Sequence, residues 1–113
     1  MEDKDTIYKL LRSAELATFV TKGFFEGSAD DLRDGFVHLS TDAQLNGTLE
    51  KHFSGEFNIF ALDCRPLMNS AELVWETSRG GALFPHLYRA IQLSDVAAIY
   101  PLPQSKWPPS HKG

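Results

Sequence analysis

Hydrophobic residues recur with the spacing of a helix near the beginning of this chain and with the spacing of strands further along. Leu16, Phe19 and Val20 follow an i, i+3, i+4 pattern, which predicts a short helix over residues 14–22 with one apolar face. Ser13 is the expected N-cap of this helix, because a serine hydroxyl accepts hydrogen bonds from the first unpaired backbone N–H groups.

A second helix is predicted from its capping residues. Thr41 is followed three positions later by Gln44, the pattern in which each side chain accepts from the backbone N–H of the other residue. We expect this helix over residues 42–54, ending at Gly55. Residues 24–34, which mix aromatic, glycine and acidic residues, are expected to form a loop.

Short apolar runs predict the strands. The run over residues 57–64 is almost continuous, which is typical of a strand buried on both faces. Pro85 has no backbone N–H to donate to a neighbouring strand, so it is expected on an edge strand or at the end of a strand. Two helices near the beginning followed mainly by strands indicate an α+β fold. The expected strands cover residues 7–11, 36–40, 57–64, 73–77, 84–90 and 97–102.

The length of the chain fits one domain, and its net charge argues against some classes of binding partner. A chain of 113 residues with 42% hydrophobic residues can build one core of its own. We expect a single globular domain over residues 7–102, a flexible N-terminus over 1–6 and an extended or disordered proline-rich tail over 103–113. The formal net charge of -4 argues against general binding to nucleic acids or anionic membranes.

The cysteine content and the N-terminus indicate a cytoplasmic protein. Cys64 is the only cysteine, so no internal disulfide can form, and it is expected to be a buried core residue. The charged N-terminus has no apolar stretch of a signal peptide, and no run is long enough for a transmembrane helix. Histidine and carboxylate spacings do not match a metal site, so we expect no metal.

Two stretches, residues 34–41 and 75–88, place ionisable side chains inside apolar runs, where they are costly to bury unless they are paired. This indicates a functional site. His38 is expected on the strand face opposite its apolar neighbours, with Ser40 on the same face. His38 either bonds to neighbouring backbone or donates to a ribose hydroxyl or phosphate.

The second stretch offers a carboxylate, a guanidinium and an aromatic face. Glu76 either pairs with Arg79 or stabilises developing positive charge. Arg79 precedes Gly80 and Gly81, which suits phosphate binding and equally suits a hairpin turn. Ser78 lies in the same turn. His86 and Tyr88 alternate on one strand face, where Tyr88 either packs in the core or forms an aromatic platform with His86 as a polar contact.

The chain as a whole resembles the bacterial domain-of-unknown-function family 952 over about residues 7–102. Long, specific motifs carry this resemblance, and the family name implies no function. The motifs are Ile7-Tyr8-Lys9-Leu10, Gly23 to Ser28, Asp34 to Thr41, Thr48-Leu49, His52-Phe53, Trp75 to Gly81, Phe84 to Tyr88 and Leu93 to Leu102.

A more distant resemblance connects the chain to ADP-ribosyltransferase-fold proteins. Ile7-Tyr8-Lys9 and the short helix after it look like the opening of that fold, and Val37-His38-Leu39-Ser40 resembles a block of the RNA 2′-phosphotransferases. The resemblance implies two small, mostly antiparallel sheets and a cleft for NAD or an ADP-ribose-type ligand. Lys9 departs from the usual His or Arg, and the arginines of the RNA-processing branch are not recognisable, which disfavours an RNA substrate.

This second resemblance assigns roles to the candidate residues. Glu76 and His38 are expected to be catalytic, with Glu76 stabilising a ribosyl cation. The alternatives are a non-catalytic nucleotide or small-ligand sensor, which Lys9 favours, and a protein-interaction module that uses residues 24–34 and the tail. The sequence does not indicate the oligomeric state. The expected ligand-binding residues are Lys9, Ser40, Ser78, Arg79, His86 and Tyr88.

Overall fold

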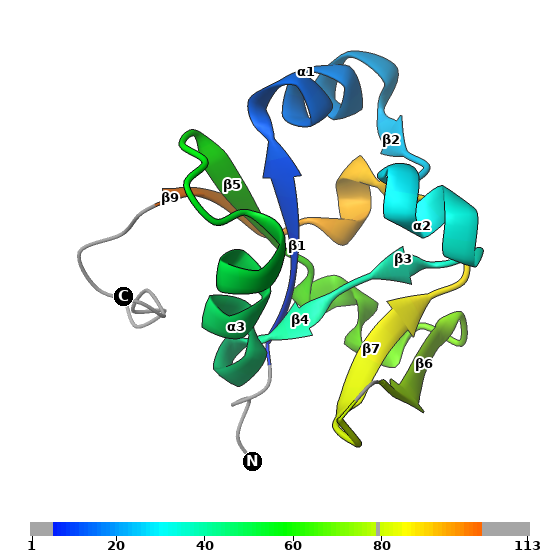
Figure 1. Ribbon diagram of the computed structural model, residues 1–113. Helices are drawn as coiled ribbons and strands as arrows, with labels where there is room; N and C mark the ends of the chain where they lie inside the picture. Colours follow the sequence, from blue (N-terminus) through cyan, green and yellow to red (C-terminus); the bar gives the residue numbers. More distant parts are fainter. Residues whose placement is uncertain (1–5, 79, 103–113) are drawn as a thin grey trace, which may run out of the picture.

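The computed structural model describes residues 6–78 and 80–102, whose strands form three antiparallel sheets (Figure 1). The described helices are α1 (Ser13–Lys22), α2 (Ala29–Asp34) and α3 (Asp42–His52), with 3₁₀ turns η1 (Arg65–Asn69) and η2 (Leu93–Asp95). The described strands are β1 (Ile7–Arg12), β2 (Phe24–Phe25), β3 (Val37–His38), β4 (Ser40–Thr41), β5 (Ile59–Asp63), β6 (Leu73–Thr77), β7 (Leu83–Leu87), β8 (Ile91–Gln92) and β9 (Ala98–Leu102). The α+β class is confirmed.

The largest sheet has the strand order β4-β1-β5-β9, and its central strand β5 is buried on both faces. Ile59 and Ala61 lie on the face that packs with Leu45 of α3. Leu62 points to the opposite face and joins the main core. The continuous apolar run therefore predicted this strand correctly, although its ends lie inside the expected 57–64 range.

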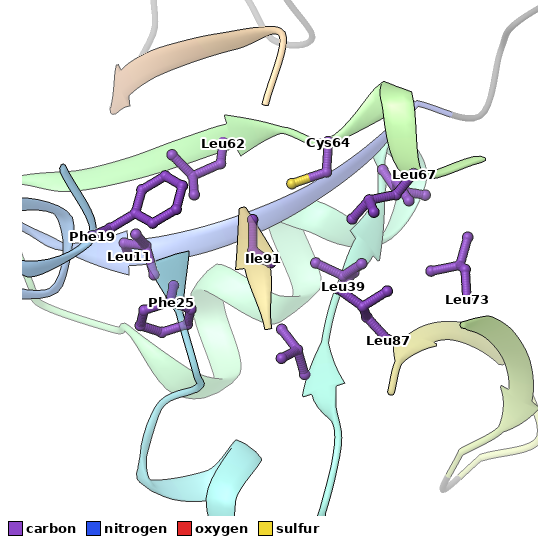
Figure 2. Close-up of a cluster of buried hydrophobic side chains, with 12 residues drawn as sticks. Leu11, Phe19, Phe25, Leu39, Leu62, Cys64, Leu67, Leu73, Leu87 and Ile91 are labelled. Carbon is purple, nitrogen blue, oxygen red and sulfur yellow. The ribbon is translucent and has the colours of Figure 1, made fainter. Parts of the chain in front are cut away.

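The main core is shared by all three sheets. Besides the four-stranded sheet, strands pair as β2-β8 and as β3-β7-β6. Figure 2 shows Ile91 of β8 with Leu11 and Leu62 of the four-stranded sheet on one side, and with Leu87 of β7 and Leu39, which connects β3 to β4, on the other. Because each sheet turns one face into this cluster, the opposite face of the β3-β7-β6 sheet points away from the core.

Local hydrogen bonds explain where the helices begin and end. In α3 the Gln44 N–H donates to Thr41 Oγ1 at 3.2 Å and the Thr41 N–H donates to Gln44 Oε1 at 3.1 Å, so the capping pattern is confirmed. In α1 the N-cap is Arg12 rather than Ser13, because the Arg12 N–H donates to Glu15 Oε1 at 2.8 Å. The first helix therefore starts one residue earlier than predicted.

Residues 24–34 are not a loop, as the sequence predicted, but contain β2 and α2. The Asp31 N–H donates to Ser28 Oγ at 3.3 Å, and the Ser28 N–H donates to Asp31 Oδ2 at 2.9 Å. Gly35 ends α2 with φ 88°, a conformation that glycine adopts without a steric penalty. This short helix was missed because it has no apolar face and its capping pair is Ser–Asp.

Two further expectations about strands were wrong. Residues 36–40 form two strands in different sheets, β3 and β4, and the sheets number three among the described residues rather than two. Pro85 lies in β7, the middle strand of its sheet. The Pro85 carbonyl accepts a hydrogen bond from the Leu39 N–H at 3.0 Å. The neighbouring strand β3 ends at His38, one residue before Leu39, so its ladder does not need a backbone N–H from Pro85.

No helix within the described residues is long and apolar enough to cross a lipid bilayer. The flexible terminus expected over residues 1–6 lies outside the described residues except for Thr6, which is buried. The expected tail over residues 103–113 also lies outside them.

Candidate functional site

Three of the residues expected to form a site, His38, Glu76 and His86, lie on the outer face of the β3-β7-β6 sheet. His38 pairs with His86 across β3 and β7, and His86 also lies opposite Val74 of β6. Val37 and Leu87 point from the same strands into the main core. Because side chains alternate along a strand, the two histidines and Glu76 point to the other side, which we call the outer face.

Glu76, His86 and Tyr88 form one hydrogen-bonded group on this face. His86 Nδ1 lies 2.6 Å from Glu76 Oε1, and the Tyr88 hydroxyl donates to the same oxygen at 2.8 Å. These bonds, first that from His86 and then that from Tyr88, lower the pKa of Glu76 below its usual value. The Glu76 side chain is 38% exposed. Among the described residues, none bonds to its other oxygen, Oε2, so an ionised carboxylate with spare acceptor capacity faces solvent.

Phe36 covers this group with its ring. It stacks on His86 with ring centroids 4.0 Å apart and planes inclined by 23°. Its centroid also lies 4.6 Å from that of His38 and 5.3 Å from that of Tyr88. Phe36 follows the glycine that ends α2, and the sequence analysis assigned it only to a strand. Its position next to a histidine-bearing strand was the available signal, but nothing in the sequence showed which rings it would contact.

His38 belongs to a second group, formed with two acidic residues and a lysine. Its Nδ1 lies 2.6 Å from Asp31 Oδ1, and its Nε2 lies 3.0 Å from Asp34 Oδ2. Lys9 Nζ lies 2.8 Å from Asp31 Oδ2 and donates to the His38 carbonyl at 3.1 Å. The Asp31 side chain is only 2% exposed and that of Lys9 only 7%. This group ties α2 to β1 and β3.

Opposing effects act on the Asp31 carboxyl. Burial alone would raise its pKa, but the hydrogen bond with His38 and the charge of Lys9 outweigh burial and hold the pKa well below its usual range. Lys9, expected to contact a ligand, is instead enclosed in this ion pair. The sequence analysis missed Asp31 and Asp34, although a lysine inside an apolar strand signals that a buried anion must lie nearby.

The remaining candidates lie apart or outside the described residues. Ser40 is buried in β4, and its Oγ lies 2.8 Å from Thr48 Oγ1 of α3, away from the outer face. Ser78 closes the β6–β7 hairpin, where its N–H donates to the Ala82 carbonyl at 2.8 Å. Arg79 lies outside the described residues, and so does its expected pairing with Glu76.

Two further groups of residues with reactive side chains are the metal-ligating residues and the cysteine of the described part of the chain. There, no three histidine, cysteine, aspartate or glutamate side chains are grouped closely enough to hold a metal ion. Cys64 is buried with its sulfur in the main core (Figure 2), and burial is the first cause that raises the pKa of its thiol. The expectation of a buried core cysteine is confirmed.

Two hollows of about 330 and 300 Å³ lie beside α1 rather than on the outer face. The first is lined by Phe19 and by residues of η2 and β9, and the second by residues of α1 and β2.

Comparisons with known proteins identify relatives of the same architecture. The model of the family described as protein of unknown function (DUF952) matches residues 10–99. A crystal structure of a double mutant of protein CC0527 from Caulobacter crescentus is 45% identical, has a TM-score of 0.81 and covers 86% of this chain and 85% of that chain.

Two further structures of the same Caulobacter crescentus protein agree. A second crystal structure is 46% identical over 86% of this chain and 85% of that chain, with a TM-score of 0.78. A solution NMR structure is 46% identical over 83% of this chain and 81% of that chain, with a TM-score of 0.75. No curated protein matches the chain significantly.

Proposed function

Since the chain belongs to the DUF952 family, whose name assigns no activity, we propose a function from the site itself: the domain binds a nucleotide of the NAD or ADP-ribose type on the outer face of the β3-β7-β6 sheet. The ligand contacts are Glu76, His86, Tyr88 and Phe36. The single cysteine makes the cytoplasm the expected place of action.

The Glu76 carboxylate is the observation that carries this proposal. It is ionised, it is fixed by His86 and Tyr88 through one oxygen, and its other oxygen has no partner among the described residues. Such a carboxylate accepts hydrogen bonds from the hydroxyls of a ribose and stabilises positive charge that develops at the anomeric carbon. The exposed ring of Tyr88 and the half-buried ring of Phe36 offer faces for a base or a pyridinium.

The resemblance to ADP-ribosyltransferase-fold proteins supports the same ligand class. The described residues begin with a strand and a short helix, as this resemblance implies, and their antiparallel sheets share one core, although the sheets number three rather than two. Lys9 and His38 do not add to the contacts, because Lys9 is enclosed and both His38 nitrogens face carboxylates. A non-catalytic nucleotide sensor is therefore the second candidate, favoured by the commitment of Lys9 to Asp31.

Thermal unfolding with a nucleotide panel tests the binding. The panel contains NAD, NADH, ADP-ribose, AMP and a 2′-phosphorylated nucleotide, each well above its expected dissociation constant. A ligand at 100 times its dissociation constant stabilises the fold by roughly 2.7 kcal/mol, which raises Tm by several degrees for a domain of this size. If no nucleotide shifts Tm, the proposal is wrong, and the result favours the alternative of a protein-interaction module.

Glu76→Gln separates an enzyme from a sensor. The amide keeps an oxygen acceptor, so we expect ligand-induced stabilisation to persist, while any NAD turnover is abolished because the negative charge is lost. Glu50→Gln, the same chemical change at an exposed position on α3, should preserve both. Unchanged turnover in Glu76→Gln would exclude Glu76 from the chemistry, and binding without turnover in the native protein would identify a sensor.

A further inference from the structure

The described histidines differ in how many ring nitrogens are engaged. His38 faces a carboxylate with each nitrogen, and His52 lies exposed at the end of α3. His86 uses Nδ1 for Glu76 and has no partner for Nε2 among the described residues. The buried polar atoms of the described residues that lack a hydrogen-bond partner do not include Nε2. This nitrogen is therefore in contact with solvent, although the side chain is only 9% exposed.

This environment fixes the state of the imidazole. A carboxylate oxygen 2.6 Å from Nδ1 accepts a hydrogen bond, so Nδ1 carries the proton and Nε2 keeps its lone pair in the neutral ring. Phe36 stacked at 4.0 Å holds the ring plane, and the ionised Glu76 stabilises the imidazolium that forms when Nε2 takes a proton. His38, with its ring centroid 5.4 Å away, borders the same ring.

We infer that His86 is the general base of the site and that Glu76 is also the positioning residue that holds its tautomer, an assignment that rests on the proposed function. Nε2 takes the proton of an acceptor hydroxyl, such as water, while the acceptor oxygen bonds to the anomeric carbon of the ribose. The bond from that carbon to the pyridinium nitrogen breaks, and its electron pair stays on nitrogen. Neutral nicotinamide leaves, and His86 returns its proton to solvent.

The tautomer is measurable without any ligand. Long-range ¹H–¹⁵N NMR of histidine-labelled protein should show that the neutral ring of His86 carries its proton on Nδ1 and none on Nε2. Glu76→Ala removes the acceptor and should move the proton toward Nε2. A native His86 that carries its proton on Nε2 would overturn the inference, whether or not any nucleotide binds.

Removal of the base is tested by turnover. His86→Asn should lower NAD hydrolysis at saturating NAD by about 10²–10⁴-fold, the usual contribution of a positioned base, and the loss of this ligand contact should reduce the NAD-induced rise in Tm by far less. Azide carries no proton to remove, so adding it should restore nicotinamide release and give a ribosyl azide. His52→Asn, at the exposed end of α3, is the matched control and should leave hydrolysis unchanged.

The outcomes separate this inference from the proposed function. No NAD-induced shift in the native protein would reject the proposed binding, and the NMR tautomer would then decide the Glu76–His86 pairing alone. Binding without hydrolysis in the native protein would overturn the base assignment and keep the binding site. A slow His86→Asn variant that azide does not rescue would assign His86 a structural role only.

Discussion

The two histidines that face each other across β3 and β7 each hold a carboxylate oxygen at 2.6 Å, yet their surroundings differ. His38 binds Asp31, which is buried and also paired with Lys9, and its second nitrogen faces Asp34. His86 binds the half-exposed Glu76, and its second nitrogen has no partner among the described residues.

The difference shows that a histidine–carboxylate pair does not by itself mark a reactive centre. Whether such a pair can contact a ligand depends on the donors and acceptors that remain after its hydrogen bonds within the protein are counted. The Lys9–Asp31–His38 group uses this capacity to hold α2 against β1 and β3, whereas one oxygen of Glu76 and one nitrogen of His86 have no hydrogen-bond partner among the described residues. Three substitutions or conditions test this contrast.

Asp31→Asn should have the largest effect. It leaves the Lys9 ammonium buried without a counter-charge, and removal of one partner of a buried ion pair costs about 3–5 kcal/mol in the free energy of unfolding. Urea denaturation measures this loss. Asp30→Asn, one position earlier on the exposed side of α2, should change little. Equal stability of the two variants would show that the Lys9–Asp31 pair is not what holds α2.

Acid should have the second largest effect, because it weakens the same Lys9–Asp31–His38 group. The pKa of Asp31 lies below the unfolded value of about 3.9, so folding favours its ionised form. Its contribution to stability is therefore complete above about pH 4 and is lost as the pH falls toward the folded pKa. Urea midpoints measured from pH 6 downward should show the native protein losing its advantage over Asp31→Asn only below about pH 4. An advantage that persists in strong acid would contradict this assignment.

Tyr88→Phe should have the smallest effect and act on the exposed group alone. It removes one of the two hydrogen bonds to Glu76, so the pKa of Glu76 should rise toward its usual value but stay lowered by His86. A ¹³C NMR titration of the glutamate carboxyls measures this. Glu72, whose pKa is lowered first by Ser70, serves as the internal control. A Glu76 titration that does not move would mean that Tyr88 does not hold the carboxylate.

Features set by neighbouring residues could be predicted from the sequence. The cap of α3 depends on Thr41 and Gln44, three positions apart, and the burial of β5 follows from its own apolar run. Strand alternation also predicted that His86 and Tyr88 share one face, and both contact Glu76. In contrast, Pro85 was misplaced because an edge position depends on how far the neighbouring strand β3 extends, which Pro85 itself does not reveal.

The site residues that were missed or misassigned depend on distant contacts. Lys9 was assigned to a ligand because its partner Asp31 lies in a helix too short and polar to show a periodic pattern. Ser40 was assigned to the face of His38 because both were placed on one continuous strand, and the change of sheet at Leu39 is a tertiary event. Phe36 contacts His86 only after β3 has paired with β7.

The pairing of β3 with β7 has a consequence for how the chain folds. A shift of β3 by one residue would turn His38 inward and Val37 outward, so the same register that buries the core also brings the two histidines together. A collapsed intermediate with misaligned strands would have neither the Phe36–His86 stack nor a complete core. Any ligand of the outer face would therefore select chains that have finished folding, and occupancy of the site would report that the strands are correctly aligned.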